Sequence, residues 1–502
     1  MKVVKTANKS WENRHEVFVE DINDMYIPGN ESALDALDSY NDATKGLQQL
    51  IADAIANNTP LRALGAGWSW PKIATVKNGV MLDTKQLNTV FTISAQSVSP
   101  ACAIEPRKLL FAQSGNCIWE LERFLFNKGM SLRTSGASNG QTIAGAMSTC
   151  THGSAFDFGS VPDFVVGLHI VSGANKHVWL ERASAPIASQ QFIDNLQTEL
   201  ISDDDLFNAA LVSFGSFGII HGVMIETEDL FLLESSMERI PYDDGLKHIM
   251  DTLDFSQATG LPNGTERPFH FSVLVNPHDI DGGAYVTTMY KRPYTTSYSK
   301  PVSNTAGIGP GDDAPSFIGL LSGMAPIITP LMVNKVLAAS LNIHSKQIGT
   351  LAEIFSNTTL RGKLLSAAIA IPLAETSRVA DILIEINKDG NPFAGLFSFR
   401  FVKGTKATLG FIKFPQTCVF ELDAAFSNDT HLFYERVWTR LEAENIPFTF
   451  HWGKVGELNP ERLDYMYGDS IDKWLQARQQ LLDADTRKIF NNALLQQWGM
   501  DA

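Results

Sequence analysis

The fold of this chain is decided by the stretch Leu132-Arg-Thr-Ser-Gly-Ala-Ser-Asn-Gly-Gln-Thr-Ile-Ala-Gly-Ala-Met-Ser-Thr-Cys-Thr-His-Gly-Ser154. It combines four glycines with small hydroxyl residues and a single histidine. A backbone with so few bulky side chains can approach a ligand closely, and its N–H groups can bind phosphate. Residues 161–173 follow with the pattern of a loop that enters a buried strand. This order favours a site for a large flat cofactor with a pyrophosphate tail, although a tight turn region without a ligand has a similar composition.

Length and charge limit the class of protein. A chain of 502 residues is too long for one hydrophobic core, so we expect two domains. Its 44% hydrophobic and 19% charged residues are typical of a soluble globular protein. The 40 Lys and Arg residues against 55 Asp and Glu residues give a net charge of −15. This acidic balance disfavours nucleic acid or an anionic membrane as the main partner.

The four cysteines indicate a reducing compartment. Cys102, Cys117, Cys150 and Cys418 form neither a CxxC pair nor a spacing typical of metal ligands. The chain does not open with an apolar run of signal-peptide length. We therefore expect free thiols, no bound metal and a cytoplasmic location.

Two kinds of pattern divide the chain. As far as about residue 235, strands, small-residue loops and helices alternate, which is typical of an α+β domain. Beyond it, strand character marks residues 270–276, 284–292, 397–402 and 407–414, and helical periodicity marks residues 376–387 and 431–444. The sequence therefore predicts a central antiparallel sheet covered by helices, with more helices after His451.

Residues 316–333 carry no charge. Their length would suit a membrane span, but Pro326, Pro330 and two glycines would break such a helix. We expect a buried pair of helices or an apolar lid instead. A lid of this kind would indicate a substrate with an apolar part.

Several common catalytic motifs are absent from the sequence. Gly65-Ala-Gly-Trp-Ser-Trp70 begins like a dinucleotide-binding fingerprint but lacks its third glycine and the helix that should follow. This argues against a nicotinamide-dependent dehydrogenase. The chain also has no P-loop, no HExxH pair and no GxSxG sequence. Metallohydrolase and serine-hydrolase interpretations therefore have no support.

Five segments in order resemble one flavoprotein family. They are Gly65–Trp70, Leu82–Asn88, Gln141–Ser154, Gly215–Ile220 and His451–Lys454. This succession resembles the vanillyl-alcohol-oxidase flavoproteins, whose FAD domain is the type shared with p-cresol methylhydroxylase (PCMH). Within them it is most similar to the sugar-lactone and alditol oxidases. The resemblance covers residues 60–230 and about 450–502 well, and the middle of the chain poorly.

The resemblance implies an α+β architecture, in which a PCMH-type FAD-binding domain of two subdomains accompanies a central substrate domain. It assigns residues 1–235, completed by 455–502, to the FAD-binding domain and residues 236–454 to the substrate-binding domain. The first glycine turn would bind the pyrophosphate of FAD through backbone N–H groups. The implied cofactor-binding residues are Gly65, Ala66, Gly67, Trp68, Ser69, Trp70, Gly140, Thr142, Ala144, Gly145, Ser148, Thr149, His152, Gly153, Ser154, Gly218, Ile219, Ile220 and Lys454.

The chain departs from the family at the site of covalent flavin attachment. Many relatives attach the flavin through the histidine of a Gly-x-Gly-His-Ser sequence, and Trp68 stands at that position here. An indole cannot form this bond. The usual second attachment site, a cysteine before the Thr-Ile-Ala-Gly segment, is also missing, because Cys150 lies after that segment. We therefore predict that FAD is bound non-covalently.

A second departure concerns the chemistry. Related enzymes place a Glu-x-Arg pair on a strand facing the flavin, and this chain has Ser398 and Arg400 on one face of that strand. Arg400 would stabilise developing negative charge, unless it only forms an ion pair within the sheet. Lys454 would act as a base or, as we favour, as a fixed cation near the flavin, and His451 could share the proton transfer. The candidate catalytic residues are Arg400, Lys454, His451 and Ser398, whereas His152 is interpreted as a structural or flavin contact.

Together these features predict an FAD-dependent oxidoreductase that removes a hydride from an alcohol-type carbon and passes it to flavin N5. An oxidase is favoured over a dehydrogenase, because the small residues 144–146 leave a path for oxygen as the acceptor. The substrate would be a small or partly apolar molecule, and a sterol or secondary metabolite is as compatible as a sugar. The missing glutamate leaves open a flavin-binding protein that has lost turnover.

Overall fold

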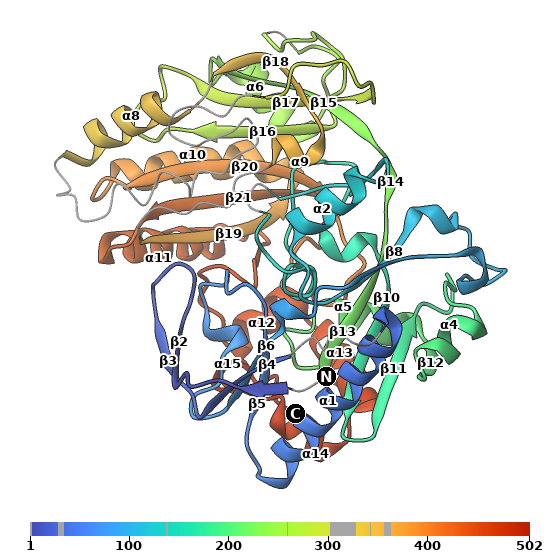
Figure 1. The fold of residues 1–502 in the computed structure, drawn as a ribbon. Coiled ribbons are helices and arrows are strands. Elements are labelled where there is room, and N and C mark those ends of the chain that lie inside the picture. The colour runs from blue at the N-terminus through green and yellow to red at the C-terminus, as the bar shows by residue number, and fades with distance from the viewer. Residues whose placement is uncertain are drawn as a thin grey trace.

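The computed structural model describes residues 3–28, 35–136, 139–258, 260–301, 328–341, 343–355 and 363–502. Within these ranges, sheets of four, six and eight strands organise the chain. The eight-stranded sheet forms the upper part of the molecule in Figure 1, and the two smaller sheets lie below it with both ends of the chain. Residues 316–327 of the uncharged segment lie outside the described residues, so the predicted lid or helix pair is not tested there. No helix in the described ranges is long and apolar enough to cross a membrane.

The four-stranded sheet is built near the N-terminus. Its order is β1 (Val3–Lys5), β4 (Asp24–Pro28), β6 (Val80–Asp83) and β5 (Leu61–Leu64), with β4, β6 and β5 parallel to one another. α1 (Ala36–Ala56) precedes β5 and begins at the cap Asp35, whose side chain accepts from the N–H of Asp38. Its apolar stripe, with Leu47 and Ile51 fully buried, packs into the core.

The six-stranded sheet forms the second part of the lower region. In order, its strands are β12 (Glu199–Ser202), β11 (Lys176–Glu181), β10 (Val165–Gly173), β13 (Ile219–Glu226), β8 (Leu109–Gln113) and β7 (Val90–Thr92). The helices among these strands are α2 (Ile118–Phe126), α3 (Ile143–Ser148), α4 (Gln190–Asn195) and α5 (Asp204–Leu211). Two short pairs complete the region: β2 (Ser10–Glu12) with β3 (Val19–Asp21), and β9 (Met130–Ser131) with β14 (Glu228–Asp229).

The eight-stranded sheet is antiparallel between all its described neighbours. In order, its strands are β18 (His344–Gly349), β15 (Phe231–Ile240), β17 (Ala284–Pro293), β16 (His270–Val275), β20 (Gly395–Lys403), β21 (Gln416–Ala425), β19 (Leu364–Pro372) and β22 (Thr449–Phe450). The helices of this part are α6 (Asp244–Thr252), α8 (Thr329–Ser340), α9 (Leu351–Ile354), α10 (Thr376–Lys388) and α11 (Asn428–Ala443).

The two faces of this sheet differ. Phe397 of β20 stacks on Phe433 of α11 with ring centroids 5.9 Å apart, so α11 covers the face on which the odd-numbered residues of β20 lie. Figure 1 shows α10 and α11 running along the sheet. On the other face, Leu396 packs in one cluster with Val333 and Leu337 of α8. Ser398 and Arg400 share this second face by strand alternation.

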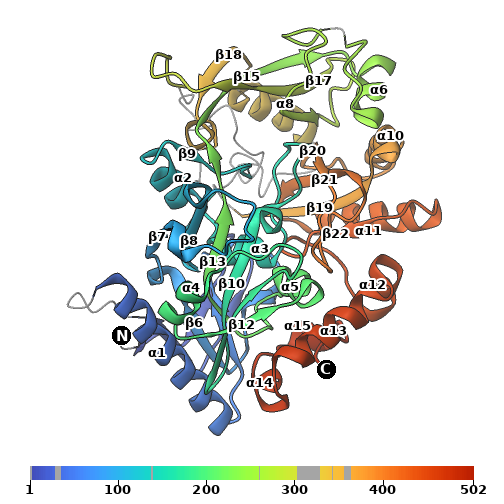
Figure 2. The ribbon, with the colours of Figure 1, turned by 90° about the vertical axis from the view of Figure 1, so that its right-hand side faces the viewer.

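The chain end returns to the lower region. α12 (Pro460–Tyr467), α13 (Ser470–Leu481), α14 (Ala484–Ile489) and α15 (Ala493–Gln497) follow one another, and Figure 2 shows them beside α5. Trp474 of α13 donates to the carbonyl of Val212 (2.9 Å). The predicted domain division at residue 235 falls within β15, and the division itself stays a prediction.

The predicted α+β class with a helix-covered antiparallel sheet is confirmed, but one predicted strand is wrong. Residues 407–414 form a turn, in which the N–H of Thr405 donates to Ile412 O (2.8 Å) and the N–H of Gly410 donates to Ala407 O (2.9 Å). The glycine inside the segment and Pro415 after it favour this turn over a ladder. The strand begins instead at Gln416.

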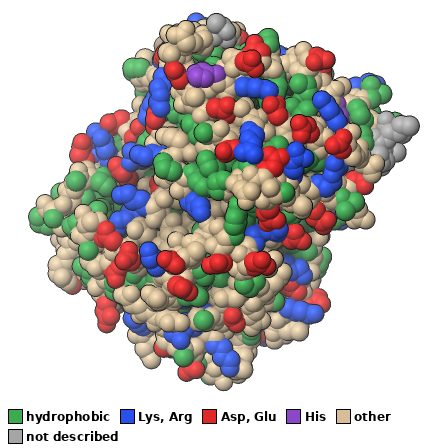
Figure 3. All heavy atoms as spheres, turned by 180° about the vertical axis from the view of Figure 1, so that it is seen from behind, with side chains coloured by type: hydrophobic (Ala, Val, Ile, Leu, Met, Phe, Trp, Pro, Cys, Tyr) green, Lys and Arg blue, Asp and Glu red, His purple; other side chains and the backbone are tan. Residues whose placement is uncertain are grey.

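The face opposite to that of Figure 1 carries acidic and basic side chains intermixed with hydrophobic ones (Figure 3).

Candidate active site

A glycine turn lines a cleft that runs between the N-terminal region and the central sheet. Gly65–Trp70 leaves the end of β5, and Gly67 has φ +73°, a left-handed conformation that glycine adopts without strain. The cleft beside this turn has an empty volume of about 1460 Å³, open solvent at its mouth included.

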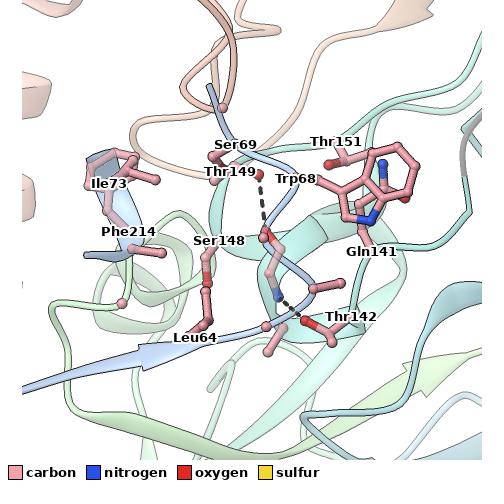
Figure 4. Close-up of a pocket in the computed structure, with 18 of the residues that line it drawn as sticks. Leu64, Trp68, Ser69, Ile73, Gln141, Thr142, Ser148, Thr149, Thr151 and Phe214 are labelled. Atoms are coloured by element: carbon pink, nitrogen blue, oxygen red, sulfur yellow. Dashed lines mark hydrogen bonds between the residues drawn. The ribbon is translucent and has the colours of Figure 1, made fainter. Parts of the chain in front are cut away.

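The second wall of the cleft comes from α3 and the loops on either side of it. Thr142 caps this helix, because its hydroxyl accepts from the N–H of Gly145 (3.3 Å). A Cβ on Gly65 would lie 2.2 Å from the Thr142 hydroxyl, so only glycine lets the two walls approach this closely. Figure 4 shows Trp68 and Gln141 on one side of the pocket, and Ile73 and Phe214 on the other.

Buried polar atoms in the cleft walls indicate a polar ligand. Trp68 Nε1, Ser114 Oγ and Gln141 Oε1 are buried, and none of them has a hydrogen-bond partner within the described residues. Buried polar groups are nearly always paired, so each of these atoms calls for a partner from a bound molecule or water. The small residues and the unpaired polar atoms that line the cleft fit FAD, which is long, flat and rich in polar atoms.

A charged cluster closes one end of the cleft. Arg400 of β20 approaches Glu421 of β21 (Nε–Oε2 2.7 Å), and the Lys454 ammonium donates to Oε1 of the same carboxylate. All three side chains line the cleft. Ser398 lies directly across the β20–β21 ladder from Glu421, so the small serine leaves the space beside the carboxylate open. The carboxylate that the sequence lacks at position 398 is therefore supplied by the neighbouring strand.

The protonation state of Glu421 follows from its neighbours. Burial by itself raises the pKa of a carboxyl group, but the attraction of Arg400 and Lys454 outweighs burial and holds the pKa of Glu421 below its usual value. Glu421 is thus an anion between two cations, and the three groups together carry a net positive charge.

Two buried histidines complete the cluster, and their hydrogen bonds fix their tautomers. His152 Nδ1 donates to the carbonyl of Gly153 (2.9 Å), which leaves Nε2 as an acceptor, 4.0 Å from Glu421 Oε1. His451 Nδ1 accepts from the N–H of Gly453 (2.9 Å), so its Nε2 carries the proton. Burial lowers the pKa of His152 to about 4 and that of His451 well below its usual value. Both rings are therefore neutral near pH 7. His152 Nε2 is a hydrogen-bond acceptor, whereas His451 Nε2 is a hydrogen-bond donor.

Most of the sequence-predicted site residues meet in this cleft. Those that line it are Gly65, Ala66, Gly67, Trp68, Ser69, Trp70, Thr142, Ala144, Gly145, Ser148, Thr149, His152, Gly218, Ile220, Arg400, His451 and Lys454. Gly140, Gly153, Ser154, Ile219 and Ser398 are not among the residues that line it. Ser154 is fully buried, donates to the carbonyl of Phe271 and accepts from the N–H of Phe401 (3.0 Å), so its hydroxyl joins the loop after α3 to the eight-stranded sheet.

Sequence reasoning missed Glu421 and the opening segment around His15. Glu421 is not part of a recognisable sequence motif. It lies opposite Ser398 because β20 pairs with β21. Trp11, His15 and Phe18 also line the cleft. The one signal for them was the aromatic content of a polar opening stretch.

Comparisons with known proteins find relatives in sequence and in fold. Residues 42–181 match the family described as FAD binding domain. The chain is 23% identical to L-gulonolactone oxidase 3 of Arabidopsis thaliana over 90% of its own length and 80% of the relative. It is 26% identical to L-gulono-1,4-lactone dehydrogenase of Mycobacterium tuberculosis over 41% of either chain, so it spans less than half of that relative. The fold resembles cholesterol oxidase from Brevibacterium sterolicum, with a TM-score of 0.71, 13% identity and coverage of 99% of this chain and 97% of the other.

The fold, the cleft and the domain match define the chain as an FAD-dependent oxidoreductase. Its FAD-binding domain is of the PCMH type, and sugar-lactone oxidases and dehydrogenases are among its homologues.

Proposed function

We propose that this protein oxidises an alcohol carbon of a small molecule, with FAD in the cleft and dioxygen as the final electron acceptor. The observation that supports this most strongly is the cluster of His152, Arg400, Glu421, His451 and Lys454 at one end of a glycine-lined cleft. In the overall reaction the substrate loses a hydride and a proton. Its two electrons, with two protons, reduce dioxygen to hydrogen peroxide.

The cofactor would lie along the cleft with its diphosphate at the glycine turn. When bound, FAD supplies the acceptor for the hydride. Gly65–Ser69 would hold the diphosphate, and Thr142–Thr149 would line the opposite side. Because Trp68 replaces the histidine of the attachment sequence, we propose that packing and hydrogen bonds alone hold FAD.

His152 is the residue best placed to accept the substrate's hydroxyl proton. Its Nε2 is unprotonated, whereas the Nε2 of His451 carries a proton and the Lys454 ammonium is paired with Glu421. A proton on His152 would be stabilised by the Glu421 carboxylate 4.0 Å away. This favours His152 over the two bases considered from the sequence.

Arg400 and Lys454 would act as fixed cations. Glu421 holds both in place, and the cluster's excess positive charge favours negative charge that develops on a group bound between them. His451 would add an N–H donor at the same end of the cleft.

Sugar lactones and related polyols are the first substrates to consider, because relatives that match this chain are named as sugar-lactone oxidases and dehydrogenases. A partly apolar alcohol is a second candidate. It is favoured by the apolar group next to Ser398, in which Trp70 and Leu274 pack against α8 and Leu396.

The direct test is anaerobic mixing of the yellow protein with panels of aldonolactones and of apolar secondary alcohols. Bleaching of the flavin absorbance by one panel, with peroxide release once air is admitted, would support the function and identify the substrate class. A protein purified gently without FAD, or one that no alcohol bleaches, would refute it. His152→Gln should slow the bleaching per bound flavin, because an amide cannot accept the proton.

Acid precipitation tests the mode of attachment. We expect a yellow supernatant, since non-covalent FAD leaves the denatured protein. A yellow pellet would show a covalent link.

The four cysteines are free in the structure, which supports the proposal that the protein works in a reducing compartment such as the cytoplasm.

A further inference from the structure

The opening segment of the chain contacts the glycine turn through a hydrogen-bonded loop. Between β2 and β3, residues 13–18 form this loop, called here the N-terminal clip. Three consecutive clip residues donate to three consecutive carbonyls of the turn. Asn13 Nδ2 donates to Ser69 O (3.1 Å), the N–H of Arg14 donates to Gly67 O (3.0 Å), and His15 Nε2 donates to Trp68 O (2.9 Å).

The clip is itself well defined. The N–H of Val17 donates to Asn13 Oδ1 (3.0 Å), and the N–H of Glu16 donates to the Asn13 carbonyl (3.0 Å). Asn13 and His15 are each only 2% exposed. The clip donors are therefore held in place before any ligand arrives.

Aromatic contacts fix the clip against the turn. The His15 ring stacks on Trp70 with centroids 3.6 Å apart and planes inclined by 15°. The Trp11 indole lies so close to Gly67 that a Cβ there would be 2.8 Å from the ring. Arg14 extends over the Trp68 indole at 4.5 Å. One side of the turn is therefore packed against the clip and against Trp11 of β2.

Peptide geometry gives this arrangement a consequence. In a trans peptide the C=O of one residue and the N–H of the next point in opposite directions. With the carbonyls of Gly67 and Trp68 bound to the clip, the N–H groups of Trp68 and Ser69 point away from it. The next N–H, that of Trp70, donates to the carbonyl of Gly453 (2.9 Å).

We propose that the N-terminal clip is a positioning element of the FAD site: by holding the carbonyls of Gly67–Ser69, it presents the N–H groups of Trp68 and Ser69 to the diphosphate of FAD. A diphosphate is a dianion, and backbone N–H groups fixed in advance bind it without further ordering of the turn. The inference rests on the cofactor placement proposed above. Asn13 and His15 act through the turn, so they are positioning residues.

The test measures FAD affinity rather than turnover. The apoprotein of each variant is titrated with FAD, and the dissociation constant is read from the change in flavin fluorescence. His15→Phe keeps an aromatic ring on Trp70 but removes the donor to Trp68 O. We expect FAD to bind about fivefold or more weakly, the effect of one buried hydrogen bond. His15→Gln restores a donor of similar reach and should recover most of the affinity.

A second pair of variants separates positioning from folding. Asn13→Asp retains the acceptor for the N–H of Val17 and loses the donor to Ser69 O, so it should also weaken FAD binding. Glu12→Gln, exposed on β2 of the same hairpin, should bind FAD like the parent. The melting temperature of each apoprotein shows whether the hairpin is intact.

The proposal is overturned if His15→Phe binds FAD like the parent, or if the affinity of all four variants falls in step with their melting temperatures. It is supported if only His15→Phe and Asn13→Asp lose affinity while their apoproteins melt like the parent. A parent protein that binds FAD but oxidises no alcohol would refute the proposed function and leave this inference standing.

Discussion

Glu421 is the residue on which the charge of the site depends. Its carboxylate is buried and lies between Arg400 and Lys454, which are themselves largely buried. Removing one partner of a buried ion pair leaves the other charges uncompensated, which costs about 3–5 kcal/mol. The same carboxylate lies beside His152 Nε2, so it also affects proton acceptance.

Glu421→Gln should therefore damage both stability and activity. We expect the free energy of unfolding at pH 7 to fall by about 3 kcal/mol and the rate of flavin reduction by substrate to fall by at least about tenfold. Chemical denaturation and stopped-flow absorbance measure the two effects. Glu435→Gln, exposed on α11, is the control and should change neither. A Glu421→Gln protein with parental rates would show that the carboxylate has no part in the chemistry.

Single residues were predictable where a motif fixed their neighbours. The glycine turn, the Thr142–His152 loop and Lys454 lie in segments whose local sequence is distinctive, and the structure brings them to one cleft. Glu421 could not be predicted in this way. Alternation within β20 gives the face of Ser398 and Arg400, but the register between β20 and β21 is set by how the two strands meet.

At the scale of elements, a polar network joins α1 to the six-stranded sheet. Tyr40 of α1 bonds His169 Nδ1 of β10 (2.7 Å), and Thr44 bonds His221 Nδ1 of β13 (3.0 Å). His221 Nε2 meets Gln113 of β8 (2.9 Å), and His169 Nε2 meets His177 of β11 (2.9 Å). The Gln113 amide donates to His221 Nε2, and one nitrogen of the His169–His177 contact must be an unprotonated acceptor, so these two contacts require neutral imidazoles.

This network predicts a loss of stability in acid. Burial lowers the pKa of His221 to about 3 from its usual 6.5. Between pH 6.5 and about 3 the unfolded chain binds a proton that the folded chain does not. The stability is therefore complete above pH 6.5 and falls as the pH decreases, by about 2 kcal/mol at pH 5 for this one group. Denaturant unfolding at pH 7 and pH 5 measures the difference.

His221→Gln stays neutral at both pH values, so its loss of stability between pH 7 and pH 5 should be about 2 kcal/mol smaller than that of the parent. His248→Gln, exposed on α6, should retain the parental difference. Equal pH dependence in the parent and His221→Gln would contradict this account.

Helices and strands were predictable from the sequence where their apolar residues recur at regular spacing. The patterns of β16, β17, β20, α10 and α11 are regular, and the structure confirms them within a few residues. β19 has the sequence Leu-Leu-Ser-Ala-Ala-Ile-Ala-Ile-Pro, whose alanines suit a helix as well as a strand. Because this segment pairs with β21 along its full length, it forms a strand.

At the scale of the whole molecule, Ser154 joins the cofactor-binding region to the central sheet. Its hydroxyl is the donor to Phe271 of β16 and the acceptor from Phe401 of β20. The side chain is fully buried. Ser154→Ala would leave the Phe401 N–H and the Phe271 carbonyl unpaired, at a cost of about 1–3 kcal/mol.

We expect Ser154→Ala to lower the melting temperature and to loosen the junction between the two regions. Hydrogen exchange should accelerate at β16 and β20 more than at β10 and β13. Ser256→Ala, exposed on a loop of the central region, is the matched control. Uniform acceleration across all four strands would indicate global destabilisation instead of a weakened junction.

The glycine turn is held by hydrogen bonds from two sides. The N-terminal clip donates to its carbonyls, and the carbonyl of Gly453 accepts from the N–H of Trp70. The cradle is therefore assembled from segments that lie far apart along the polypeptide. We expect FAD to be loaded only after residue 453 has left the ribosome, since a nascent chain halted before Gly453 has only half of its cradle. Flavin supply should then affect how many finished molecules become active, and not how fast they are translated.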